Sequence, residues 1–454
     1  MRDNRVTEGY ERGGPCRSRP DEVLLHFIWR FRYFNHHELF TEAGETVWIH
    51  ATGEPNVHQG PDFLHARISI GGILREGPVE LHIRTSDWHR HAHDGDIHYR
   101  EVVLHVVWEN DLEDSPGGLP VLVLGHRIPK LLLGRYRQWM DSRSFIPCER
   151  RLPAVDASTR NGWLQQLLWH RLQQRALFIR SCLEDNHQHW EETTWWLMAR
   201  SLGQPVNAAA FEAIGRSLPV SLLARHRGEP VRLEALLLGQ AGLLEGEFAE
   251  EYPRALQKEY SFCRVKYGLS VSPVPLSFLR MRPGHFPTVR LAQLAGLLGR
   301  PGGWFSRIRD ADSPRDVAAL LDVTVSGYWD DHYLLTAPSA RGSKRSSAPG
   351  PERTSAPRPR RMGEAMKKGI VINAFVPLLF TYGWLRGLPA YQEKALRWLK
   401  ETGPEDNSIL TGWRRLGIPV TNAAESQALL ELKKSYCSPR KCLDCAIGQR
   451  LLSS

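Results

Sequence analysis

Two short stretches near the N-terminus carry side chains that suit divalent-cation chemistry. Asp62 begins an apolar, β-branched run that reads as a strand, and Glu80 and His82 lie two residues apart in the next alternating run. Side chains two residues apart share one face of a strand, so Glu80 and His82 point to the same side. If the two strands are neighbours, the carboxylates of Asp62 and Glu80 meet at one sheet edge, where Mg²⁺ or Mn²⁺ relieves their repulsion.

A cation in this place would bind a phosphate ester together with its attacking water, which is the chemistry of a metal-dependent phosphodiesterase. We therefore predict that Asp62, Glu80 and His82 are catalytic, and that Asp62 and Glu80 bind the cation. The expected substrate is DNA or RNA.

The elements that must position these residues follow one another in a recognisable order. Asp21 is a suitable N-cap for the run 21–34, which has apolar residues at helical spacing. Ser86 and Asp87 are suited to begin a second, short helix. Strands are predicted at 45–51, 63–70, 78–84 and 102–109.

This succession of helix, three strands, helix and strand resembles the PD-(D/E)XK nuclease superfamily. The resemblance is carried by Pro61-Asp62 at the head of the second strand and by Glu80-Leu81-His82 in the third. It implies an α/β domain with a mixed sheet flanked by helices, and cleavage of nucleic acid. His82 stands where that superfamily usually has Lys, so an inactive nuclease fold that binds nucleic acid or acts as a scaffold is the alternative interpretation.

The chain is also similar, over nearly its full length, to a bacterial family catalogued as a domain of unknown function, number 2851. No activity is implied by that similarity. The stretches that carry it are 60–63 (GPDF), 79–88, 103–107, 234–242, 282–294, 327–332 (GYWDDH) and 437–448.

Length and composition indicate a globular protein of two or three domains. The chain has 454 residues, 42% of them hydrophobic, and fifteen Trp residues that can fill large cores. The polar N-terminus and the lack of an apolar run of about 18 residues predict neither a secretory signal nor a membrane span, so we expect a cytoplasmic protein. The net charge of +9 favours anionic partners such as nucleic acid, although part of it lies in the Pro-, Ser- and Arg-rich stretch 338–361.

The pattern changes from period 2 to helical spacing after the first domain. Helical stretches are predicted at 159–182, 189–203, 206–226, 231–245, 366–387, 390–402, 406–416 and 421–435. The fold class is thus an α/β nuclease-like domain followed by a mainly α-helical region. The predicted parts are a flexible tail (1–20), the nuclease-like domain (21–145), a helical domain (146–337), a disordered basic linker (338–361) and a helical C-terminal part with a cysteine cluster (362–454).

Three cysteines within nine residues form a second chemical signal. Cys437, Cys442 and Cys445 have a spacing that lets thiolates share a metal ion, and neighbouring Lys and Arg residues are expected to lower the pKa of these thiols. Cys148, just after the first domain, is the predicted fourth ligand, with Cys263 or a nearby His as competitors. The arrangement resembles the cysteine set that holds an iron-sulfur cluster in several nucleases of the PD-(D/E)XK type, and Zn²⁺ is the competing metal.

A group of histidines allows a third and weaker interpretation, a zinc hydrolase. Its predicted ligands are His89, His91 and His93, whose spacing of two residues converges on a strand and not on a helix. The helix start at Ser86 argues against this ligand set. The whole group consists of His82, His89, His91, His93, His98 and His105.

Overall fold

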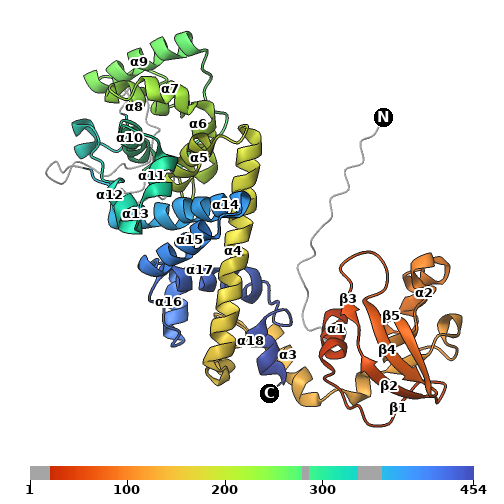
Figure 1. The fold of residues 1–454 in the computed structure, drawn as a ribbon. Coiled ribbons are helices and arrows are strands. Elements are labelled where there is room, and N and C mark those ends of the chain that lie inside the picture. Colours follow the sequence, from red (N-terminus) through yellow and green to blue (C-terminus); the bar gives the residue numbers. More distant parts are fainter. Residues whose placement is uncertain (1–20, 279–285, 336–359, 454) are drawn as a thin grey trace, which may run out of the picture. The chain divides into compact units, whose positions relative to one another are not determined.

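The computed structural model describes residues 21–278, 286–335 and 360–453 (Figure 1). The described residues cluster into two compact units, one formed by 21–160 with 434–453 and the other by 161–433. The predicted tail 1–20 and residues 338–359 of the predicted linker lie outside the described residues.

The first unit contains a mixed β-sheet. Its strands are β1 Leu39–Phe40, β2 Thr46–Ala51, β3 Glu54–Pro55, β4 Phe63–Ile70, β5 Ile73–Arg84, β6 Leu104–Glu109 and β7 Val121–Val123. The order is β1-β2-β4-β5-β6-β7, with β3 paired to β4; β1 to β5 pair antiparallel, whereas β5, β6 and β7 pair parallel. Figure 1 shows β2, β4 and β5 side by side in the red and orange part of the chain.

Helices flank this sheet, as the sequence predicts. α1 Glu22–Phe31 and α2 Asp87–Arg90 contact β5, and the unit also contains α3 Lys130–Met140 and, from the C-terminal end of the chain, α18 Ala446–Ser453, which contact each other. The side chain of Asp21 accepts a hydrogen bond from Leu24 N at 2.9 Å, so the predicted N-cap of α1 is confirmed. α1 packs against β5, and Leu25, Ile28 and Trp29 on it are fully buried.

A β-bulge lies at the beginning of β4. The pairing with β5 shifts register between Phe63 and Ala66, and His65 within the shift has a positive φ of 59°. Bulges bend a strand and re-aim the neighbouring side chains. Here the bulge separates the regular ladder from the short segment that carries Asp62, one residue before Phe63.

The second unit is helical, in agreement with the predicted fold class. One predicted stretch, 206–226, is two helices, because Pro219 follows Leu218 and cannot continue the hydrogen-bonded helix. The helices are α4 Ala157–Asp185, α5 Trp190–Leu202, α6 Ala208–Ser217, α7 Val220–Arg225, α8 Pro230–Gln240, α9 Glu251–Tyr267, α10 Pro287–Leu298, α11 Trp304–Asp310, α12 Pro314–Ala319, α13 Glu364–Ile370, α14 Val376–Arg386, α15 Pro389–Glu401, α16 Ser408–Arg415 and α17 Ala423–Glu431.

One helical segment among the described residues is long and apolar enough to cross a membrane. It runs from Glu364 to Arg386 and joins α13 to α14 through the π-helical turn Val371–Phe375. Two thirds (67%) of its most apolar window is buried, and Ile370, Phe375 and Phe380 belong to the core of the second unit. Packing within that core accounts for its apolar character.

Candidate functional site

The carboxylates of Asp62 and Glu80 meet where β4 begins. Phe63 pairs with Val79, so the antiparallel register places Asp62 opposite Glu80. Each carboxylate accepts a hydrogen bond from a backbone amide of the other's segment. Asp62 N donates to Glu80 Oε2 at 3.0 Å, and Leu81 N donates to Asp62 Oδ2 at 3.0 Å. The structure thus brings the two predicted cation ligands together.

The loop that precedes Asp62 is held by its own backbone bonds. Gly60 has a φ of 109°, which favours glycine because a Cβ is strained there. The Asn56 side chain donates to Pro61 O at 3.0 Å, and Asn56 N donates to Asp62 O at 2.8 Å. These bonds fix the direction from which Asp62 enters the sheet.

His82 lies beside Glu80, together with two further imidazoles. Glu80 Oε1 is 3.4 Å from His82 Nε2 and 3.4 Å from His93 Nε2. His91 Nδ1 is 3.0 Å from His82 Nε2. One nitrogen from each of His82, His91 and His93 lies within 4.8 Å of the other two, and in the described part of the chain no other such group of three or more His, Cys, Asp or Glu residues occurs.

His91 and His93 reach this cluster because α2 is very short. The helix ends at Arg90, His91 follows as its C-cap, and Ala92 adopts a left-handed conformation with φ 60° before His93 begins a 3-10 turn. A helix would keep histidines at i and i+2 apart, but His91 and His93 lie beyond the end of α2 and so can converge. His89, within the helix, is instead bonded to Asp94 at 2.6 Å and is not part of the cluster.

Burial controls the charges in this site. Glu80 is 4% exposed, and its pKa is raised to about 9, first by burial and then by the charge of Asp62. His82 is 1% exposed, and burial followed by the neighbouring His105 lowers its pKa to about 2. Burial also lowers the pKa of His105 to about 4. Without a cation, Glu80 therefore holds a proton near neutral pH and both imidazoles are uncharged.

Three residues that the sequence did not single out for the site lie next to it. His26 Nε2 is 3.2 Å from Asp62 Oδ2. Burial is the main cause that raises the pKa of Glu22, and the negative charge of Asp62 raises it further. Glu22 and His26 are four residues apart on one face of α1, a spacing that could have identified them. Tyr99 stacks on His93 with ring centroids 3.7 Å apart, a contact that no local pattern predicts.

The cluster is open to solvent on one side. His91 is exposed, and the side chains of His26 and Asp62 are 37% and 25% exposed. Arg84, which could have blocked the site, instead forms an ion pair with Glu109 at 2.7 Å. A substrate can therefore approach from the side of Asp62 and His91.

The cysteines predicted to bind metal all belong to the first unit. Cys148, Cys442 and Cys445 are buried, and Cys437 is half-buried. Burial, and after it the neighbouring thiols of Cys445 and Cys442, raises the pKa of Cys148 to about 12. Among the described residues these cysteines do not form a group whose ligand atoms all lie within 4.8 Å of one another, so the structure does not bring the predicted ligand set together. The competing ligand Cys263 lies in α9 of the second unit.

The expected lowering of the thiol pKa values is wrong for Cys442. Burial, followed by Cys445, raises the pKa of Cys442 to about 12, and the nearby Arg440 opposes this only as a lesser cause. The Arg440 guanidinium also donates to Ser142 O at 2.9 Å, which ties the cysteine segment to the loop before Cys148.

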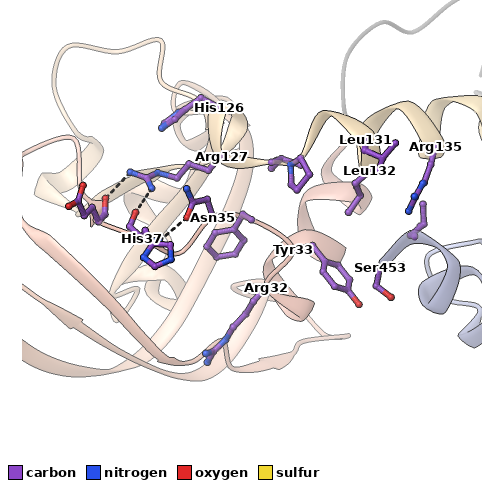
Figure 2. A pocket seen from close by; sticks show the side chains of 15 residues that line it. Arg32, Tyr33, Asn35, His37, His126, Arg127, Leu131, Leu132, Arg135 and Ser453 are labelled. Carbon is purple, nitrogen blue, oxygen red and sulfur yellow. Dashed lines mark hydrogen bonds between the residues drawn. The ribbon is translucent and has the colours of Figure 1, made fainter.

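A cavity of about 790 Å³ lies in the first unit at the other end of α1 (Figure 2). Its lining is basic and includes Arg32, Arg127 and Arg135, together with Tyr33 and Ser453. Arg127 donates to two backbone carbonyls at 2.9 Å each, so its guanidinium holds the loop as well as lining the cavity. None of the acidic or imidazole groups of the Asp62 and Glu80 site lines this cavity.

Comparison with known proteins gives one match. The model of a family described as "Protein of unknown function (DUF2851)" matches residues 22–408. No curated protein and no solved structure matches the chain.

Proposed function

Since the chain belongs to the DUF2851 family, whose description carries no activity, we propose from its own residues that the first unit is a metal-dependent nuclease, a phosphodiesterase acting on DNA or RNA. The observation that carries the proposal is the meeting of the Asp62 and Glu80 carboxylates beside uncharged imidazoles. The order and pairing of the strands support it, because three antiparallel strands are followed through α2 by a parallel one, as in the nuclease superfamily that the motifs resemble.

The residues fit a divalent cation, with Mg²⁺ and Mn²⁺ the ions first expected. The carboxylates of Asp62 and Glu80 each accept a backbone hydrogen bond where β4 and β5 pair, and the buried Nε2 atom of His93 has no hydrogen-bond partner. When bound, the cation would supply Lewis-acid activation of water and neutralise charge on the phosphate. Glu80 must lose its proton to act as a ligand, so cation binding should release a proton near neutral pH.

The roles that we propose for His82 and His26 differ because His82 is buried and His26 is partly exposed. His82 is buried and neutral, so it cannot supply the positive charge that Lys supplies in the superfamily, and it can offer only a lone pair. His26 lies at the exposed side, in contact with Asp62. We assign to His26 the orientation of the attacking water or the transfer of its proton.

Nucleic acid is the proposed partner because the chain is cationic. The net charge is +9, and arginines line the cavity at the far end of α1 (Figure 2). α1 has ten residues, so this cavity lies on the order of 15 Å from the carboxylates, a distance that a bound strand can span. A cytoplasmic location is part of the proposal.

The test is cleavage of labelled single- and double-stranded DNA and RNA with Mg²⁺, Mn²⁺ or Zn²⁺ added singly. Asp62→Asn and Glu80→Gln should each reduce the rate by at least about a hundredfold, as loss of a charge-stabilising group does in other enzymes. Glu76→Gln, an exposed change on the same strand, is the matched control and should leave the rate unchanged. Binding of nucleic acid without cleavage under all three conditions would favour the second candidate, a silent nuclease fold, which the uncharged His82 supports.

A further inference from the structure

We propose that three imidazoles and one carboxylate of the first unit bind a single transition-metal ion of the zinc class. The ligands are Glu80, His82, His91 and His93. The role of this ion in cleavage rests on the proposed nuclease function. The existence of the binding site does not, because metal content alone tests it.

Three of the distances between the ligand atoms are close to those around a tetrahedral ion. With metal bonds of about 2.0 Å, neighbouring ligands of a tetrahedron lie about 3.3 Å apart. Glu80 Oε1 lies 3.4 Å from Nε2 of both His82 and His93, and His82 Nε2 lies 3.0 Å from His91 Nδ1. The three imidazole nitrogens already lie within 4.8 Å of one another, whereas the Glu80 carboxylate lies outside this group and must shift to complete the set.

His93 gives an independent reason to expect an ion. The residue is 9% exposed, and its Nε2 atom is buried without a hydrogen-bond partner although it points toward Glu80. A buried polar atom without a partner destabilises the fold. A metal ion would satisfy this nitrogen, while the stacked ring of Tyr99 holds the imidazole in place.

His105 is the positioning residue of this centre. Its Nε2 atom lies 2.9 Å from His82 Nδ1. If His82 binds the ion through Nε2, its Nδ1 carries the proton and donates it to His105 Nε2. Such a second hydrogen bond fixes the tautomer and orientation of a ligating imidazole.

The chemistry of the donors selects the metal. Imidazole nitrogen suits Zn²⁺ and neighbouring transition ions, whereas Mg²⁺ prefers oxygen ligands in an octahedral arrangement. Three nitrogens and one carboxylate oxygen therefore favour Zn²⁺ over Mg²⁺. Asp62 remains beside the centre, where it contacts His26 and the Leu81 amide.

The experiment uses the full chain, stripped with a chelator and then given Zn²⁺ alone. All proteins carry Cys442→Ser, so that zinc at the cysteine cluster is not counted. Elemental analysis should find one zinc per chain, and His93→Asn should weaken zinc binding more than a hundredfold. His89→Asn is the matched control, because His89 lies in the same segment but outside the cluster.

Two further variants keep the test decisive. His91→Asn changes an exposed ligand that the fold does not need, so its effect on zinc affinity cannot be ascribed to misfolding. His105→Asn should weaken zinc binding by 10- to 100-fold, the range found for second hydrogen-bond partners of ligating histidines, whereas a purely structural role would leave affinity unchanged.

The outcomes separate this inference from the proposed nuclease. Stoichiometric zinc that is lost in the His91→Asn and His93→Asn proteins supports the centre even if no nucleic acid is cleaved. If the protein cleaves nucleic acid with Mg²⁺ but binds no zinc, the nuclease proposal is supported and the zinc centre is refuted. Wild-type zinc affinity in both variants also overturns it.

Discussion

The raised pKa of Glu80 predicts that the metal-free first unit loses stability as the pH rises. The folded-state pKa is about 9, against an ordinary value of 4.5, so the folded protein retains a proton that the unfolded chain has lost. A carboxyl group of this kind stabilises fully below pH 4.5, and its contribution falls as the pH rises toward 9. Between pH 7 and 9 the buried histidines are neutral in both states, and the fall due to Glu80 amounts to about 2 kcal/mol.

Hydrogen exchange of the β5 amides measures this effect locally, without requiring the two units to unfold together. In chelator-treated protein, the protection of β5 should fall roughly thirtyfold from pH 7 to pH 9, after correction for intrinsic exchange. Glu80→Gln should abolish the fall, because an amide has no proton to lose and still accepts from Asp62 N. A bound divalent cation should also abolish it, since the carboxylate is then already ionised.

The control is Glu76→Gln, which should show the same fall as the wild-type protein because Glu76 is exposed. The reasoning is refuted if β5 protection in the metal-free wild-type protein stays constant or rises from pH 7 to pH 9. It is also refuted if Glu80→Gln loses protection with pH as the wild-type protein does.

Three other predictions follow from the first unit. Asp62→Asn should bring the pKa of Glu80 down toward its ordinary value, because it removes the neighbouring charge; the fall in β5 protection from pH 7 to pH 9 should then shrink. The pKa values of His82 and His105 are lowered in the folded protein, so their contribution to the free energy of unfolding is present above pH 6.5 and is lost as the pH falls below it. The β6 amides of metal-free protein should therefore lose protection from hydrogen exchange between pH 6.5 and pH 5. Cys148→Ser should release as much iron or zinc as Cys442→Ser, measured by elemental analysis of protein purified without oxygen; unchanged metal content would remove Cys148 from the site.

Local patterns determined the elements of the first unit. Apolar spacing behind Asp21 placed α1, and strand alternation placed β2, β4 and β6 within a few residues of their observed ends. β5 begins at Ile73 and not at 78, and the sequence patterns did not predict α3 or the short strands β1, β3 and β7. The correct predictions succeed because side-chain periodicity and capping act over only a few residues. The same reasoning put Glu80 and His82 on one face of a strand.

The sequence also indicated that Asp62 and Glu80 could meet, but only the tertiary structure decided how. Their contact depends on the pairing of Phe63 with Val79. This register of β4 against β5 depends on a bulge at His65, which the sequence pattern does not predict. Helix α1 brings Glu22 and His26 to the same place by packing on β5. These partners are far apart in the chain, so local periodicity carries no information about their distance.

The composition of the histidine cluster was decided in the same way. The sequence suggested His89, His91 and His93 as one set, whereas the structure groups His91 and His93 with Glu80 and His82. The difference arises because α2 ends after four residues and Ala92 turns the chain back toward β5. Ligand spacing along a chain predicts a site only when the backbone conformation between the ligands is known, and here a single left-handed residue, Ala92, separates the helix from His93.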